Sequence, residues 1–291
     1  MSQTDVGADH RPRLPRADAP HRVPDSRSRP LSEPAPGVRP PVARRRRGLP
    51  RGPLVEVAIV LAGIVAYFGA RGLTESDADV AVAHAHDVVA FERALGLYLE
   101  PQLQELVLGH ELLIDALNWV YIWGHWPVIA VVLGWTLRRH PRAYVVLRNA
   151  LVISGAIGVV VFVLYPVAPP RLAGLGLLDS VSERSHAYRV LQPPAFVNQY
   201  AAIPSLHVGW DLLMGITIVR CARRPLVRLI GVLLPIAMVA SVVLTANHYL
   251  VDGVAGVVVA LTGLVLAERF AARRTPPLRV MVPAPREPRG S

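Results

Sequence analysis

The chain contains a single cysteine, no lysine and few charged side chains among its 291 residues. Cys221 has no second cysteine with which to form an internal disulfide, and no group of histidines and cysteines has the spacing of a zinc site. We therefore predict no internal disulfide and no zinc site. Charged residues make up 18% and hydrophobic residues 52% of the sequence, whereas soluble domains have about 25% charged and about 45–50% apolar residues. These proportions exclude an ordinary soluble domain.

The net charge of +10 comes from the two ends of the chain. Residues 1–53 hold 12 arginines and five acidic residues, and residues 268–291 hold six arginines and two acidic residues. The 13 arginines and 14 acidic residues between these ends nearly cancel. Basic tails beside membrane spans favour contact with anionic lipid headgroups at the cytoplasmic face. We therefore expect membrane lipids as partners and no nucleic acid.

The two ends also have the composition of disordered chain. Residues 1–53 are rich in proline, arginine and serine, and residues 272–291 are similar. Both are predicted to be disordered tails, which leaves residues 54–271 as the membrane-embedded domain. The arginine run at 44–47 precedes an apolar stretch, as in an export signal. Because a long polar stretch precedes this run and no clear small-residue cleavage site follows, we predict a retained first span.

The domain is divided into six apolar segments, at residues 54–70, 117–137, 149–166, 205–219, 229–246 and 249–267. With a rise of about 1.5 Å per residue, segments of about 15–21 residues are about 22–32 Å long, which is enough for a short membrane span. We predict that the segments form six transmembrane helices. The expected fold class is therefore an all-α, polytopic membrane bundle.

Arginines give the predicted orientation of this bundle. They gather between the second and third segments, between the fourth and fifth, and after the sixth. The positive-inside rule places these loops, and both termini, in the cytoplasm. The regions 71–116 and 168–204 and the turn at Asn247 then face outward, and we predict a plasma-membrane location.

The outward region 71–116 has apolar residues at helical spacing. Phe91, Leu95 and Leu99 form the first part of the pattern, and Pro101 marks the start of a second helix. We predict one or two amphipathic helices that lie at the membrane interface.

Polar residues gather at the predicted outward ends of three spans, at residues 165–171, 203–207 and 247–252. Such residues are costly at the rim of a membrane span, so each is a candidate for function. The predicted orientation brings all three groups to the same face. Asn247, which begins the third group, is assigned to substrate binding.

The residue types in these groups are those of a phosphoryl-transfer site. His248 and Asp252 are four residues apart, so on a helix the carboxylate can accept the Nδ1 proton and leave the other nitrogen free to attack. His207 supplies a second imidazole for proton transfer. Arg171 has the planar guanidinium that suits phosphate or carboxylate, and Ser205 can donate a hydrogen bond to the same anion.

A further set of polar residues lies within the predicted spans. Asn118, Tyr121 and His125 share one face of the second span, where they either line the headgroup pocket or form hydrogen bonds between helices. Asp211 lies four residues after His207 and is expected to orient it.

The spellings Ala-Pro-Pro-Arg at 168–171, Pro-Ser-Leu-His at 204–207 and His-Tyr-x-x-Asp at 248–252 occur in this order. Together they resemble the type 2 phosphatidic acid phosphatase superfamily, which includes lipid phosphate phosphatases, glucose-6-phosphatase and vanadium haloperoxidases. The spelling is most similar to the branch that contains inositolphosphorylceramide synthase. The resemblance covers about residues 115–268.

The resemblance implies a role for each motif residue. His248 would attack phosphorus to form a phosphohistidine, Asp252 would orient it, and His207 would protonate the leaving oxygen. It implies no metal or other cofactor, because protein cations and helix N-terminal amides balance the phosphate charge. Cleavage of the phosphohistidine by water makes a phosphatase, and cleavage by an alcohol makes a transferase.

The chain departs from the superfamily pattern at its cationic positions. The lysine of the first motif is absent, the arginine expected before the third-motif histidine is Val242, and the glycine before the second-motif histidine is Leu206. Arg148 does not replace the lysine, because the 23 residues to Arg171 span about 35 Å on a helix. Arg171 is therefore the predicted phosphate contact.

These observations predict a membrane enzyme that cleaves or transfers a phosphate-containing lipid headgroup. A lipid phosphate would be its substrate, and water or an alcohol its acceptor. A simple lipid phosphate or diphosphate phosphatase is the nearest alternative. Two non-enzymatic alternatives remain at this point: a haem protein with axial ligands among His125, His207 and His248, and a transporter that uses the intramembrane charges.

Overall fold

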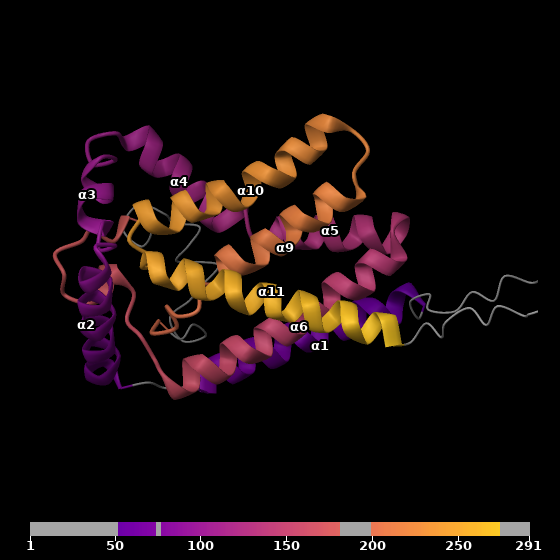
Figure 1. Cartoon of the computed structure of the whole chain (residues 1–291), viewed down its shortest axis with the longest axis horizontal. Coiled ribbons are helices and arrows are strands. Elements are labelled where there is room, and N and C mark those ends of the chain that lie inside the picture. Colours follow the sequence, from indigo (N-terminus) through magenta and orange to yellow (C-terminus); the bar gives the residue numbers. More distant parts are fainter. Residues whose placement is uncertain (1–51, 74–76, 181–198, 274–291) are drawn as a thin grey trace, which may run out of the picture. The chain divides into compact units, whose positions relative to one another are not determined.

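The computed structural model describes residues 52–73, 77–180 and 199–273, and these residues are helical apart from their connections (Figure 1). The helices are α1 (Pro53–Leu73), α2 (Ala78–Leu95), α3 (Glu100–Glu105), α4 (Glu111–Trp123), α5 (Trp126–Arg139), α6 (Pro141–Leu164), η1 (Pro170–Leu172), α9 (Leu206–Cys221), α10 (Pro225–Leu244) and α11 (Leu250–Arg273). No strand occurs in these three ranges, so the predicted all-α class is confirmed. The tails predicted to be disordered lie almost wholly outside the described residues.

Three helices, α6, α10 and α11, are long and apolar enough to cross a membrane. The pair α4 and α5 passes the same test as one bent span, which gives three or four candidates in the described part of the chain. The 16 residues of α9 extend about 24 Å, which is short of the roughly 30 Å hydrocarbon core. The apolar part of α1, Leu54–Ala66, is also short. These helices fit a membrane-embedded protein, but they do not confirm six spans.

The second predicted span, 117–137, is wrong as a continuous helix. It breaks between α4 and α5, whose axes differ by 45°. A side chain at Gly124 would lie 2.4 Å from the carbonyl oxygen of Val120, and Pro127 has no N–H with which to continue the helical hydrogen bonds. His125 lies in this break, directly before α5. The direction of its side chain is therefore not given by the helical spacing from Asn118 and Tyr121.

The centre of the fold is formed by α6, α9, α10 and α11, which pack side by side (Figure 1). Small residues allow close approach of helices in membrane proteins. A Cβ atom at Gly256 of α11 would lie 2.1 Å from the carbonyl oxygen of Ser205, at the start of α9. The Ser205 N–H donates to the carbonyl oxygen of Asp252 at 3.0 Å. The beginnings of α9 and α11, which carry two of the three motifs, are thereby joined through their backbones.

The region predicted to form interfacial helices contains α2 and α3. The buried face of α2 includes Ala81 and Ala85, which are fully buried, and it packs on the segment around Val167 and on Tyr249. The predicted apolar face points away from the rest of the protein: Phe91 and Leu95 are 54% and 55% exposed. The helix therefore covers the segments that carry the motifs and turns its large apolar side chains outward.

The close contact at Gly256 leads to a prediction about stability. Gly256→Ala should lower the free energy of unfolding by about 1–3 kcal/mol, because the new methyl group displaces the Ser205 backbone. Thermal unfolding of detergent-solubilised protein measures this change. Gly253→Ala on the same helix is the control, since its Cβ would meet nothing closer than 4.0 Å. Equal midpoints for the two variants would contradict the prediction.

Candidate active site

The two histidines predicted to be catalytic lie opposite each other. His207 is in the first turn of α9, His248 comes just before α11, and their ring centroids are 6.1 Å apart. The ring of Tyr121 stacks on His207 at 4.6 Å, and the ring of His125 lies 4.3 Å from it. The fold thus brings together polar side chains from α4, the α4–α5 break, α9 and the turn before α11.

His248 is paired with Asp252. The Nδ1 atom of His248 lies 3.2 Å from Oδ2 of Asp252, and the same oxygen accepts the Tyr249 N–H at 3.0 Å. Asp252 is fully buried, and His248 is 6% exposed. When Nδ1 donates to the carboxylate, Nε2 is the nitrogen that carries a lone pair. The pair therefore has the geometry that an attacking imidazole requires.

A tight turn at the end of α10 holds His248 in place. The N–H groups of Asn247 and His248 both donate to the carbonyl oxygen of Val242, at 2.9 and 3.1 Å. The turn depends on Ala246, whose φ of 53° lies in the left-handed region. That conformation costs about 1–2 kcal/mol for a residue with a side chain, so the surrounding contacts must hold it.

Arg171 lies against the same turn. Its N–H donates to the carbonyl oxygen of Ala246 at 3.1 Å, and its Nε donates to Oδ1 of Asn247 at 3.0 Å. Its Nη1 forms an ion pair with Asp179 at 2.7 Å. The guanidinium is therefore held next to the residue that precedes His248, as the motif order predicts. Its charge is partly balanced by a carboxylate that the sequence did not single out.

Ser205 and Asn247 have structural contacts in addition to their predicted contacts with substrate. Ser205 is fully buried and caps α9, with Oγ accepting the Val208 N–H at 3.5 Å. The side chain of Asn247 donates to Oγ1 of Thr245 at 2.6 Å while it accepts from Arg171. Asn247 thus connects the guanidinium to the turn. Contact of either residue with substrate stays a prediction.

Asp211 is paired with a histidine other than the one expected. The sequence suggested that Asp211 orients His207, but its Oδ1 lies 3.0 Å from Nδ1 of His125. Both residues are buried, with Asp211 fully so. The break between α4 and α5 brings His125 to this position, which the spacing within α9 does not reveal. Two His–Asp pairs therefore lie near His207, with the rings of His125 and His248 at 4.3 and 6.1 Å from its ring.

Two of the three histidines considered as haem ligands lie too close together to hold a haem between them. The rings of His125 and His207 lie 4.3 Å apart, so no macrocycle fits between these two rings. Among residues 52–73, 77–180 and 199–273, no three histidine, cysteine or acidic side chains form a group that could hold a metal ion.

Sequence reasoning missed two fully buried glutamates that hold the start of α11. Oε1 of Glu100 accepts the Leu250 N–H at 2.9 Å, and Oε1 of Glu92 accepts the Val251 N–H at 2.8 Å. The first N–H groups of a helix have no partner within it. Here carboxylates from α3 and α2 supply partners. In the sequence these glutamates are two acids among many in an amphipathic region, so no local signal identifies them.

The ionisation of Glu92 differs from that of an ordinary glutamate. Burial raises the pKa of Glu92 to about 8, and the nearby charges of Glu100 and Asp252 act in the same direction. The hydrogen bond from Val251 lowers this pKa and only partly offsets the effect of burial. At neutral pH the Glu92 carboxyl is therefore mostly protonated. Its Oε2 atom has no hydrogen-bond partner among the described residues.

The raised pKa of Glu92 predicts a pH dependence of stability. The folded protein holds this proton more tightly than the unfolded chain does. Protonation of Glu92 therefore stabilises the fold in acid, and this stabilisation is lost as the pH rises through about 8. Glu92→Gln, which cannot ionise, should show a smaller fall in thermal midpoint between about pH 6 and about pH 9. Glu105→Gln, at an exposed position of α3, should follow the wild type. Parallel curves for Glu92→Gln and wild type would contradict this assignment.

Comparison with known proteins identifies the family. A family model of the PAP2 superfamily matches residues 86–266, which is well over half of the chain. The matched range contains every residue of the site described above. No curated protein and no solved structure matches the chain. The match confirms the resemblance at the level of the superfamily, while the inositolphosphorylceramide-synthase-like branch stays a prediction. PAP2 proteins are generally phosphatases, so the match supports an enzyme of the lipid phosphatase or phosphotransferase type. The chain belongs to the PAP2 superfamily.

Proposed function

We propose that this protein cleaves or transfers a phosphate-containing lipid headgroup through a phosphohistidine on His248. The observation that carries the proposal is the placement of the His248–Asp252 pair opposite His207, with ring centroids 6.1 Å apart. That separation leaves one imidazole to attack phosphorus and the other to transfer a proton. Arg171 supplies a cation beside the same turn.

In the first step, Nε2 of His248 attacks the phosphorus atom of the headgroup. A phosphorus–nitrogen bond forms, the bond to the leaving oxygen breaks, and that oxygen takes the electron pair and a proton from His207. The Nδ1 proton of His248 stays hydrogen-bonded to Asp252, whose charge balances the growing positive charge of the ring.

The second step regenerates the enzyme. His207 accepts a proton from water or an alcohol, whose oxygen attacks phosphorus and breaks the phosphorus–nitrogen bond. Release of the phosphate or phosphodiester product leaves His248 unmodified. The motif spelling favours an alcohol acceptor, and hydrolysis is the second candidate. The arginine-rich loops support a site at the external face of a six-span plasma-membrane protein, with both termini in the cytoplasm.

The side chains around His207 support its role as the proton carrier. Tyr121 and His125 pack on its ring, and Asp211 holds His125. We infer that Tyr121 and His125 form the wall of the headgroup pocket and that Asp211 acts by fixing His125. The α9 N-terminus, one residue before His207, adds amide groups suited to an anion.

Removal of either histidine should abolish turnover. Purified protein would be assayed with radiolabelled phosphatidate, isoprenyl diphosphate and phosphatidylinositol. His248→Ala and His207→Ala should lower kcat by about 10²-fold or more, because each removes a chemical step, and vanadate should inhibit the wild type. His140→Ala, in the connection between α5 and α6, is the control and should retain activity. Activity that survives His248→Ala would rule out the proposed nucleophile.

The ion pair at Arg171 predicts opposite effects for its two members. Arg171→Ala should lower kcat/KM by about 10-fold or more, since a hydrogen bond to a charged group contributes about 1.5–3 kcal/mol. Asp179→Asn should lower KM, because the carboxylate no longer competes with the substrate phosphate for the guanidinium. Arg220→Ala, which breaks an exposed ion pair with Glu268, is the control. A higher KM for Asp179→Asn would show that this carboxylate supports binding.

A further inference from the structure

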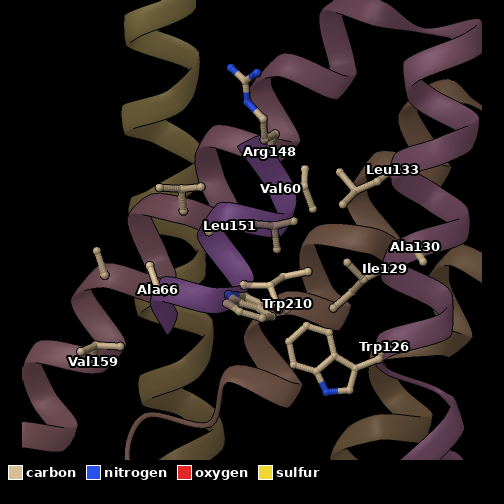
Figure 2. A pocket seen from close by; sticks show the side chains of 15 residues that line it. Val60, Ala66, Trp126, Ile129, Ala130, Leu133, Arg148, Leu151, Val159 and Trp210 are labelled. Atoms are coloured by element: carbon tan, nitrogen blue, oxygen red, sulfur yellow. The ribbon is translucent and has the colours of Figure 1, made fainter. Parts of the chain in front are cut away.

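An apolar cavity of about 440 Å³ lies between α1, α5 and α6 (Figure 2). Its walls include Val60 of α1, Leu133 of α5 and Leu151 of α6, and its floor is formed by Trp126 and Trp210. Helices α5 and α6 belong to the candidate spans, so the walls lie within the part of the protein suited to a membrane. Helix α1, which forms the third wall, lies outside the range matched by the family model.

The two ends of the cavity differ in chemistry. Arg148, at the end opposite the tryptophans in Figure 2, is paired with the buried carboxylate of Glu56, so its charge is balanced. At the other end the rings of Trp126 and Trp210 meet edge to face, 5.8 Å apart. Nε1 of Trp210 donates to Oγ of Ser154 at 3.0 Å, which fixes the orientation of that ring.

The tryptophan floor leads to the proposed active site. The ring of Trp210 stacks on His125 at 5.8 Å, and the ring of Trp126 meets the same histidine at 5.2 Å. His125 in turn lies 4.3 Å from His207. A single imidazole thus separates the floor of the cavity from the proposed proton carrier.

The lining of the cavity indicates what occupies it. At about 30 Å³ per water, the volume corresponds to roughly 15 waters, and each ordered water needs two to four polar partners. Arg148 is the one charged side chain among the lining residues, and it already bonds Glu56 and Asn149. Water is therefore a poor occupant, whereas hydrocarbon gains from contact with apolar side chains.

We propose that this cavity holds a hydrocarbon chain of the lipid substrate, whose headgroup end lies at Trp126 and Trp210. This proposal rests on the proposed function and adds a chain-binding site to it. The enzyme would then select lipids by the length of the chain that fits between α1, α5 and α6. Each methylene removed from the cavity should weaken binding about fourfold.

Two pairs of neighbouring substitutions test the proposal. Ala130→Phe on α5 and Ala66→Phe on α1 place a ring in the cavity. Their controls are Val131→Phe and Val65→Phe, at neighbouring positions that do not line the cavity and are 69% and 71% exposed. Thermal unfolding of all four variants identifies any that fail to fold. If one cavity variant fails to fold, the other cavity variant and its control still test the proposal.

The first readout is binding and does not require turnover. Phosphatidate with a photoactivatable group near the end of one long chain is incorporated into phosphatidylcholine vesicles containing the protein. Cross-links should map to residues that line the cavity, and their yield should fall several-fold in Ala130→Phe and Ala66→Phe only. Equal yields in the cavity variants and their controls would overturn the proposal.

The second readout is kcat/KM for long-chain and short-chain lipids with the same headgroup. The cavity variants should lose about 10-fold on the long chain and little on the short one, because only the long chain reaches the new ring. Turnover that is unchanged in these variants would overturn the chain site and leave the proposed function intact. If the cavity is cross-linked but no variant and not even the wild type turns over any lipid, the proposed function is overturned. The bound hydrocarbon chain would then not belong to a substrate.

Discussion

The first turn of α11 is held by carboxylates from three separate helices. Asp252 comes from α11 itself, Glu92 from α2 and Glu100 from α3, and each accepts one backbone N–H at the helix start. His248 immediately precedes this turn and is bonded to the same Asp252. The position of the proposed nucleophile therefore depends on Glu92 and Glu100 as well as on Asp252, because these two glutamates hold the backbone at the start of α11, directly after His248.

Helices α2 and α3 therefore help to build the candidate site, because they supply Glu92 and Glu100. An amphipathic helix that only lay on a membrane would present its large apolar residues and would need no buried acid. Helix α2 does present Phe91 and Leu95, but it also buries Glu92 among groups that raise its pKa to about 8. A protonated carboxyl at this position limits the number of negative charges near Asp252 at neutral pH. Helix α2 thus exposes large apolar side chains on one face and, through Glu92, holds the start of α11 with the other.

The sequence predicted the features that depend on short spacing. The four-residue interval between His248 and Asp252 and the order of the three motifs were enough to indicate a candidate site and to identify the superfamily, of which the family match confirms the second. The partner of Asp211 and the glutamates at α11 could not be predicted, because these contacts join residues 86 to 159 positions apart. The break in the second span had a local signal in Gly124 and Pro127, but the continuous apolar composition concealed it.

The ion pair between Arg171 and Asp179 has a consequence for selectivity. An unpaired guanidinium beside the turn would attract chloride, bicarbonate and other small anions of the medium as well as a phosphate monoester. Because the Asp179 carboxylate already lies 2.7 Å from Nη1 of Arg171, an anion from the medium must compete with it for the guanidinium. A doubly charged phosphate with several acceptor oxygens meets that requirement better than a monovalent ion does. Under the proposed function, the ion pair with Asp179 would therefore favour phosphate over the monovalent salts of the medium at Arg171.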